Sequence, residues 1–299
     1  MKSTQLTILT ERRYVEPARV TPYIRNILDE DRLVRDALEK RGLKVARCSW
    51  DDPRVDWSDT EYILFRSTWD YFDRFPEFCV WLEKSKAKTS MLNPYEIIRW
   101  NLDKHYLEDL AKAQVHVPPT IFIESGNQAT LTDWVVGPGW REVILKPVVS
   151  GAARHTYRFR AGESGQYETL FRKLIADEPM MIQEFQEKVL EKGELAFMVI
   201  GGKFTHAVVK KAKKGDFRVQ DDFGGSVQHH DPAGHEILFA EQAVARCGYN
   251  PVYARVDAIW DNNGRMAVSE LELIEPELWF RFNPEAADRL ADHIINRYF

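Results

Sequence analysis

Two glutamates at strand spacing, Glu270 and Glu272, are the residues of this sequence that most plainly suggest chemistry. Alternate side chains of a β-strand point to the same face. The two carboxylates therefore share one face, and the intervening Leu271 and Leu273 share the other. A strand that carries adjacent carboxylates on one face needs something to oppose their repulsion.

The strand-like run before these glutamates carries Arg255 and Asp257, and Asn263-Gly264 joins the two runs. Asn-Gly in this position predicts a β-hairpin with a two-residue type I′ turn. Counting outward from that turn pairs Asp257 with Glu270, and Arg255 with Glu272. Opposed like charges destabilise a sheet, so the pattern indicates a divalent cation held by carboxylate oxygens. The alternative is an edge hairpin whose acidic face is simply solvated.

A lysine in an apolar run offers a second candidate, because Lys146 lies within "VILKPV". A buried lysine needs an anionic partner or loses its charge. The small residues of Ser150–His155 follow it and would let a loop close over phosphates with backbone N–H groups. The loop lacks the Gly-Lys-Ser/Thr ending of a P-loop. The alternative is that Lys146 lies at a strand end and its side chain extends to place the ammonium group in water.

A basic run lies further along the chain, and Gly224-Gly225 follows it. Its five cations are Lys210, Lys211, Lys213, Lys214 and Arg218. Such a run is usually a solvated face, although a phosphate-gripping loop has the same composition. The neighbouring His229 and His230 lack further ligands at metal-binding spacing.

The segment "RSTWDY" follows Tyr62–Phe65, an apolar run typical of a strand that is buried on both faces. Ligands of open α/β sheets bind beyond the carboxyl ends of such strands. We therefore expect Arg66 to bind a substrate carboxylate and Asp70 to bind an ammonium group. The hydroxyls and the aromatic walls of this predicted pocket come from Ser67, Thr68, Trp69 and Tyr71. The alternative is a helix N-cap with the aromatic rings in the core.

Composition excludes several functional classes for this chain of 299 residues. It carries 41 basic and 46 acidic residues, a net charge of −5, which argues against bulk binding to nucleic acid or anionic membranes. Its three cysteines lie far apart and are expected to be buried thiols in a reducing compartment. No apolar run approaches the length of a membrane span, and the N-terminus is too polar for a signal peptide. These features predict a cytoplasmic protein.

The order of expected elements changes near residue 100. Before it, four short strands alternate with helices at 29–42 and 74–85, and a long loop covers 11–29, which predicts a parallel α/β sheet. After it, hairpins mix with helices, which favours α+β. The expected elements of this second part include a helix at 101–114, a hairpin across Gly201-Gly202 and a helix at 233–247.

The ordered motifs resemble the ATP-grasp superfamily, and the resemblance covers residues 100–299 well. They are Lys104 in a helix, "ILKP", "QEF", "GELAFMVIGGKF", "GDFRVQDDFGG" and "ARVDAIW…SELELIEP". The N-terminal "DEDRLVRDALEKRG", "WDDPRVDW" and "FRSTWDY" are similar to the D-cycloserine-forming ligases, which cyclise O-ureido-D-serine. Two departures are Glu272, where most ATP-grasp enzymes have asparagine, and Gln220, where the glutathione synthetase-like loop has asparagine.

The resemblance implies a Rossmann-like, pre-ATP-grasp domain at 1–100 that binds substrate, a small ATP-grasp lobe at 101–185 and a large lobe at 186–299. It implies a two-lobed α+β module with ATP between the lobes. It also implies ATP together with two Mg²⁺ ions, with Mn²⁺ as the alternative ion.

The same resemblance implies a role for each candidate residue. Asp257, Glu270 and Glu272 would hold the metal, and Arg255, Lys146 and Arg218 would act in catalysis. The residues expected at the nucleotide are Lys104, Lys146, Ser150, Gly151, Glu184, Phe185 and Glu194, with Glu184 and Phe185 meeting adenine mainly through the backbone. The residues expected to bind the substrate are Arg66, Ser67, Thr68 and Asp70, together with Gly224 and Gly225.

These roles predict an ATP-dependent carboxylate–amine ligase that acts through an acylphosphate on a small amino-acid-like substrate. The attacking amine belongs either to a second molecule or to the same one. The alternatives are a dipeptide ligase and a nucleotide-binding sensor without ligase chemistry. Neither a nucleic acid nor a membrane is expected as a partner, and the sequence leaves a homo-oligomer open.

Overall fold

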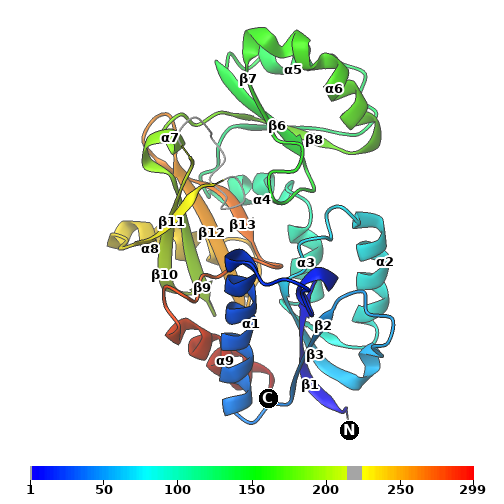
Figure 1. Cartoon of the computed structure of the whole chain (residues 1–299). Helices are drawn as coiled ribbons and strands as arrows, with labels where there is room; N and C mark the ends of the chain where they lie inside the picture. Colours follow the sequence, from blue (N-terminus) through cyan, green and yellow to red (C-terminus); the bar gives the residue numbers. More distant parts are fainter. Residues whose placement is uncertain (1, 214–223) are drawn as a thin grey trace.

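The computed structural model describes residues 2–213 and 224–299, and the strands of these residues form three sheets (Figure 1). The first sheet is parallel, in the order β2-β1-β3-β4, as the alternation of strands and helices predicts. Its strands are β1 (Thr4–Thr10), β2 (Val45–Ser49), β3 (Thr60–Ser67) and β4 (Ser90–Leu92). Its two long helices are α1 (Pro22–Lys40) and α2 (Phe75–Lys86).

Helix α1 begins earlier than the sequence analysis expects, so the long loop expected at 11–29 is wrong. The Thr21 hydroxyl accepts a hydrogen bond from the Ile24 N–H at 3.2 Å, and Pro22 takes the first helical position. Both features are typical of a helix start. Ile27 and Val34 are buried on the same face. The remaining loop contains only the short 3-10 turn Arg12–Tyr14.

The second sheet is antiparallel and forms a separate lobe at the top of Figure 1, in the order β5-β8-β6-β7. Its strands are β5 (Thr120–Ile123), β6 (Glu142–Pro147), β7 (Tyr157–Arg160) and β8 (Met180–Glu184). Helices α5 (Leu131–Val136) and α6 (Ser164–Asp177) pack on it and complete its own hydrophobic core. Helix α5 was not expected from the sequence. It is short, but Thr130 and Asp133 form a capping box at its start.

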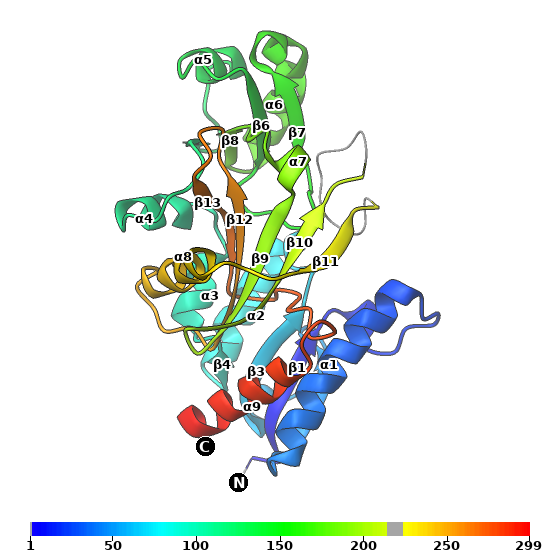
Figure 2. The ribbon, with the colours of Figure 1, turned by 90° about the vertical axis from the view of Figure 1, so that its left-hand side faces the viewer.

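The third sheet has five strands in the order β11-β10-β9-β12-β13. They are β9 (Glu194–Ile200), β10 (Lys203–Lys211), β11 (Ser226–His230), β12 (Tyr253–Trp260) and β13 (Met266–Glu272). The hairpin expected across Gly201-Gly202 is confirmed, because Ile200 pairs with Lys203. Helix α8 (Gly234–Ala245) covers one face of the sheet (Figure 2).

The single helix expected at 101–114 is instead two helices, α3 (Tyr95–Asn101) and α4 (Tyr106–Lys112). Two hydrogen bonds, one to a distant carbonyl and one to a neighbouring side chain, stabilise the break. The Lys104 N–H donates to Val148 O at 3.2 Å, and the Asp103 carboxylate accepts the His105 N–H at 2.8 Å. Both amides therefore have partners without a continuous helix. The other short elements are α7 (Val189–Lys192) and 3-10 turns at Trp57–Asp59 and Ala161–Glu163.

The C-terminal helix α9 (Glu285–Tyr298), which the sequence analysis did not include, lies beside α1 (Figure 2). One hydrophobic cluster joins Ile8 and Val34 of the first part to Met198 and Leu290 of the last. The first and third sheets are therefore held together by a shared core, whereas the second sheet has a core of its own. Among the described residues, no helix combines the length and apolarity that crossing a membrane requires.

Candidate active site

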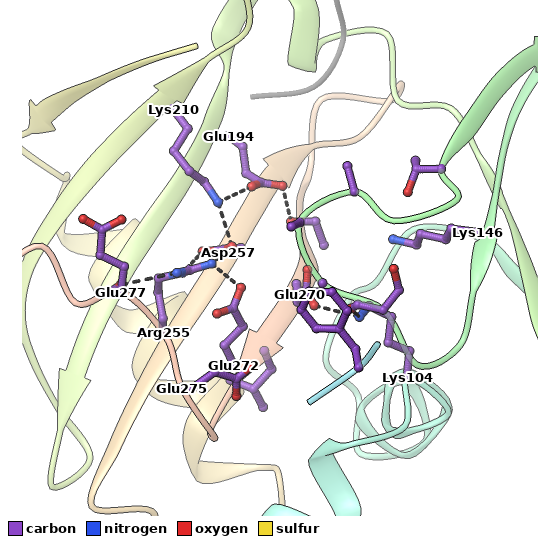
Figure 3. A pocket seen from close by; sticks show the side chains of 18 of the residues that line it. Lys104, Lys146, Glu194, Lys210, Arg255, Asp257, Glu270, Glu272, Glu275 and Glu277 are labelled. Atoms are coloured by element: carbon purple, nitrogen blue, oxygen red, sulfur yellow. Dashed lines mark hydrogen bonds and ion pairs between the residues drawn. The ribbon is translucent and has the colours of Figure 1, made fainter. Parts of the chain in front are cut away.

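A cavity of about 360 Å³ lies where the three sheets meet. Trp69, Tyr71 and Phe72 line it from the loop after β3, and Lys146 lines it from β6. The five-stranded sheet contributes its charged face. The charged residues of that face are Glu194, Lys210, Arg255, Asp257, Glu270 and Glu272 (Figure 3).

The hairpin of β12 and β13 pairs Arg255 with Glu272 and Asp257 with Glu270, as expected, but not through the expected turn. Asp261 N–H donates to Arg265 O at 2.8 Å, so three residues lie between the closing pair, and Gly264 has a left-handed φ of +83°. The predicted two-residue turn is therefore wrong. The register shift between Asp257 and Ala258 restores the expected pairs.

Asp257 is held between two cations. Arg255 donates to both of its oxygens, at 2.8 and 2.9 Å, and Lys210 Nζ donates to Oδ2 at 2.7 Å. Burial raises the pKa of Asp257, but the charges of Arg255 and Lys210 outweigh it and hold this pKa below its ordinary value. The same Lys210 forms an ion pair with Glu194, and Ser269 Oγ lies 2.8 Å from the other oxygen of Glu194. Asp257 therefore carries its charge inside the protein.

Glu270 faces the cavity from β13, where Lys104 Nζ lies 2.9 Å from its Oε1. Lys104 also donates to Ser150 O at 2.6 Å, which connects the break between α3 and α4 to the small-residue loop after β6. Burial raises the pKa of Glu270, but Lys104 and then Lys146 lower it below its ordinary value. Glu270 is thus a charged carboxylate between two lysines (Figure 3).

The ammonium group of Lys146 has no hydrogen bond or ion pair with any residue in 2–213 or 224–299. Burial lowers its pKa to about 8. The lysine points into the cavity from the small lobe, on the other side from Arg255 and Lys210 (Figure 3). It is a cation without an anion of its own, in a space where an anionic ligand would supply one.

Three further carboxylates gather at the end of β13. Burial raises the pKa of Glu272 to about 7, that of Glu275 to about 8 and that of Glu277 to about 7. Glu272 forms an ion pair with Arg255, yet burial outweighs this partner. Burial therefore favours the protonated, neutral form of these carboxyl groups near neutral pH.

The predicted metal ligands partly fit a hard divalent cation. Within 2–213 and 224–299, no group of three acidic, histidine or cysteine side chains is arranged to hold a metal. Both oxygens of Asp257 are already hydrogen-bonded to cations. Glu270 and Glu272 are 32% and 26% exposed, and only one oxygen of each is bound to a protein cation. Their remaining oxygens are suitable ligands for Mg²⁺.

All the residues predicted at the nucleotide line the cavity, but the backbone of Glu184 and Phe185 is less available than expected. The Glu184 N–H donates to Pro119 O, and the Phe185 N–H donates to Glu142 O at 2.9 Å. Their carbonyls accept from Gln186 and Asn262. Contact between these two amides and an adenine ring is therefore not supported by this structure.

The four polar residues predicted to read the substrate do not line the cavity. Arg66 is 2% exposed and forms an ion pair with Glu30, and Ser67 Oγ lies 2.7 Å from Thr10 Oγ1. Thr68 is fully buried. Asp70 accepts hydrogen bonds from Trp50 Nε1 at 2.7 Å and Arg74 Nη1 at 2.8 Å.

The loop that carries these four residues does reach the cavity, through Trp69 and Tyr71, as expected for its walls. Gly224 and Gly225 lie just before β11 and do not line the cavity, whereas Val227 does. Arg218, predicted as catalytic, lies outside the described residues.

Sequence reasoning missed Lys210, Glu275, Glu277 and Trp279, all of which line the cavity. Lys210 was counted in an exposed basic run, although it is 5% exposed. The available signal was its position two residues after Val208, which places both side chains on the same face of the strand. Glu275 and Glu277 follow Glu272 within five residues, just beyond the end of the strand, so their closeness in sequence was the available signal.

Comparison with known proteins shows that the chain is similar to proteins of D-cycloserine biosynthesis. The family described as D-cycloserine synthetase DcsG, N-terminal domain, matches residues 6–93. The cycloserine biosynthesis protein DcsG of Streptomyces lavendulae is 29% identical over 273 residues, which span 88% of this chain and 91% of that protein. The crystal structure of D-cycloserine synthetase DcsG superposes with a TM-score of 0.85 at 27% identity, covering 98% of this chain and 99% of the other.

The chain is a homologue of D-cycloserine synthetase DcsG, an enzyme that forms a C–N bond, and its structure matches those of ATP-grasp ligases. A more distant ATP-grasp structure, the D-alanine–D-alanine ligase from Bacillus anthracis, shares the fold with a TM-score of 0.66 at 14% identity, over 98% of this chain and 97% of that one. In this chain, the cavity between the sheets contains cations and carboxylates of the kind that ATP-dependent bond formation requires.

Proposed function

We propose that this ligase activates a carboxylate of a small amino-acid-like substrate by phosphorylation and then joins it to an amine. The carboxylate oxygen would attack the γ-phosphorus of ATP, and ADP would leave with the electrons of the broken P–O bond. The amine nitrogen would then attack the acyl carbon of the acylphosphate. Phosphate would depart, and the amine would release its proton to solvent.

The observation that carries this proposal is the meeting of Lys146, Lys104 and Arg255 around Glu270 in one cavity (Figure 3). Phosphoryl transfer depends mainly on positioning and on neutralising developing charge. Lys146, whose ammonium group forms no ion pair with a described residue, would bind nucleotide phosphate. Arg255, which Asp257 and Glu272 orient, would stabilise the transferring group.

Glu270 and Glu272 would hold Mg²⁺, which would neutralise phosphate charge during the transfer. Two ions are proposed, and Mn²⁺ would suit the same oxygen ligands. Asp257, predicted as a third ligand, would contribute mainly by fixing Arg255 and Lys210. Ser150, Gly151, Glu184, Phe185 and Glu194 remain proposed nucleotide contacts, and all five line the cavity.

The substrate would enter from the side of the first sheet, where Trp69, Tyr71 and Tyr23 meet Glu275. Residues 1–100 would form a Rossmann-like substrate-binding unit, and residues 101–185 and 186–299 the two ATP-grasp lobes. Because the relative with 88% coverage is a cycloserine biosynthesis protein, we infer an amino acid that carries its own nucleophile. The product would then be a ring formed with release of ADP and phosphate.

The test is phosphate release from Mg-ATP with a panel of D- and L-amino acids that includes O-ureido-D-serine. We expect one substrate to stimulate release at least tenfold, and hydroxylamine to trap the acylphosphate as a hydroxamate. Mass spectrometry separates a cyclised product from a dipeptide. Glu270→Gln is the matched inactive control, because it keeps the size of the side chain and removes its charge. ATP binding without stimulation by any amino acid would indicate a sensor instead.

A further inference from the structure

The loop after β13 contains one residue in a conformation that its side chain disfavours. Trp279 has a φ of +46° and is 4% exposed. A bulky aromatic residue rarely adopts this left-handed region, and such residues cluster at functional sites when the surrounding structure enforces them. The structure must therefore hold Trp279 in place by other contacts.

Two side chains from distant elements clamp the backbone on both sides of Trp279. Glu30 of α1 accepts the Leu278 N–H at 2.7 Å and the Phe280 N–H at 3.3 Å. His206 Nε2 of β10 lies 2.9 Å from Leu278 O and 3.3 Å from Trp279 O. Burial lowers the pKa of His206 to about 4, so the ring is neutral at neutral pH. Because both partners of Nε2 are carbonyls, Nε2 carries the proton and donates.

The ring of Trp279 lies against the cations of the cavity. The Arg255 guanidinium is 4.8 Å from its ring centre, and Lys210 Nζ is 5.8 Å away. A cation over an indole face is attracted to it, and the attraction grows when water is excluded. The Trp279 Nε1 atom has no hydrogen-bond partner among the residues that the structure describes. Backbone contacts, rather than a hydrogen bond of the ring, therefore set the position of this surface under Arg255.

We propose that Trp279 is a positioning residue for Arg255, and that Glu30 and His206 hold it there. The inference rests on the proposed function, in which Arg255 stabilises the transferring phosphoryl group. A flat aromatic face under the guanidinium restricts its motion on one side, while Asp257 and Glu272 restrict it in the plane. Restricting the motion of Arg255 matters for the chemical step more than for ATP binding, because Lys146 and Lys104 also meet the nucleotide.

The first experiment compares Trp279→Phe with Trp279→Leu by steady-state kinetics. Phenylalanine keeps an aromatic face and leucine does not. We expect Trp279→Phe to keep kcat within about threefold, and Trp279→Leu to lose kcat at least tenfold while KM for ATP changes less than threefold. Trp134→Leu, a tryptophan substitution on α5 in the small-lobe core, should keep kcat per folded molecule. Equal kcat in the Phe and Leu variants would overturn the proposal, as would a parallel loss of ATP binding.

A second measurement does not depend on turnover. The Trp279 ring current should shift the Nε–H resonance of Arg255 in ¹⁵N NMR spectra, and Trp279→Leu should remove that shift while Trp134→Leu preserves it. Glu30→Gln, which keeps the size of the side chain but weakens the clamp, should move the resonance part of the way and lower kcat several-fold. An Arg255 resonance that is unchanged in Trp279→Leu would refute the positioning role even if the protein proves to be a ligase. A changed resonance in a protein without turnover would instead refute only the proposed function.

Discussion

Among residues 2–213 and 224–299, two buried arginines pair with carboxylates, and one of these two lines the cavity. Arg255 is 8% exposed and lines the cavity with Asp257 and Glu272. Arg66 is 2% exposed and is enclosed with Glu30, between the rings of Tyr253 and Phe280. The partner acids also differ, because Glu30 accepts backbone N–H groups of the 278–280 segment. The first arginine is placed to meet a ligand, whereas the second holds a loop.

Arg66→Met should produce the largest effect, on stability. It leaves the buried Glu30 without its cation, which typically costs 3–5 kcal/mol of unfolding free energy. Urea denaturation measures this loss. Replacing both residues, as Glu30→Met with Arg66→Met, should recover only part of it, because two backbone amides then lose their acceptor. Arg32→Met, which removes two exposed ion pairs, should cost less than about 1 kcal/mol. A stable Arg66→Met variant with lost turnover would restore the substrate role expected from the sequence.

Arg255→Met should act on turnover instead. Removing one preorganised donor to a transition-state charge typically lowers kcat by 10²–10³, equivalent to about 2.7–4 kcal/mol. Under the same assay, Arg66→Met should lose less than tenfold per folded molecule, since Arg66 does not line the cavity. Initial rates of phosphate release measure kcat, and circular dichroism measures the folded fraction. Together they give the kcat of each variant per folded molecule, relative to wild type. Similar losses in both variants would erase the distinction between the two arginines.

Lys146→Met should weaken ATP binding by roughly 1.5–3 kcal/mol, the scale of a hydrogen bond to a charged group. Lys146 is charged below its pKa of about 8 and neutral above it. Wild-type affinity for ATP should therefore fall as the pH rises above about 8. Because bound phosphate raises the pKa of the lysine, this fall should begin at a higher pH in the complex. Calorimetry at pH 7 and pH 9.5 checks both statements. Lys146→Arg, which keeps its charge across this range, is the control. An unchanged affinity in Lys146→Met would mean that this lysine merely reaches water.

Glu272→Gln should have the smallest effect, a gain of about 1–2 kcal/mol in unfolding free energy at pH 8. The pKa of Glu272 is raised to about 7 in the folded protein from an ordinary 4.5. Between these values the folded state binds more protons than the unfolded state, so stability falls as the pH rises from 4.5 to 7. The amide removes this contribution. Thermal unfolding at pH 5 and pH 8 measures the difference between variant and wild type.

Asp257→Asn supplies the contrast to Glu272→Gln. The pKa of Asp257 lies below its ordinary value because Arg255 and Lys210 outweigh burial. The carboxylate thus stabilises the fold above its unfolded pKa, and this contribution is lost only as the pH falls through the lower folded value. Asp257→Asn should therefore be less stable than wild type at both pH 5 and pH 8. If Glu272→Gln raises the unfolding free energy and Asp257→Asn lowers it, the charge distribution of the cavity is supported. Changes of the same sign would contradict it.

The sequence by itself determined the elements that carry the charges and the order in which they follow. Alternation placed Glu270 with Glu272 and set Asp257 and Arg255 opposite them, because side chains of a strand repeat every two residues. The parallel first sheet followed from alternating strands and helices. Lys146 was singled out by apolar neighbours, and its place in the cavity, without an ion pair to any described residue, supports the choice.

The tertiary structure alone decided which charged groups share a space. Arg66 and Arg255 are the same residue type near strand ends, and only packing against Glu30 encloses the first. Lys210 faces Glu194 because a register shift between Phe204 and His206 moves β10 by one residue, and plain counting from Gly201-Gly202 would have placed Gly193 there. Trp279 reaches Arg255 through contacts from α1 and β10, which are remote in the chain. Local patterns fix periodicity, but long-range packing and single-residue bulges fix which faces meet.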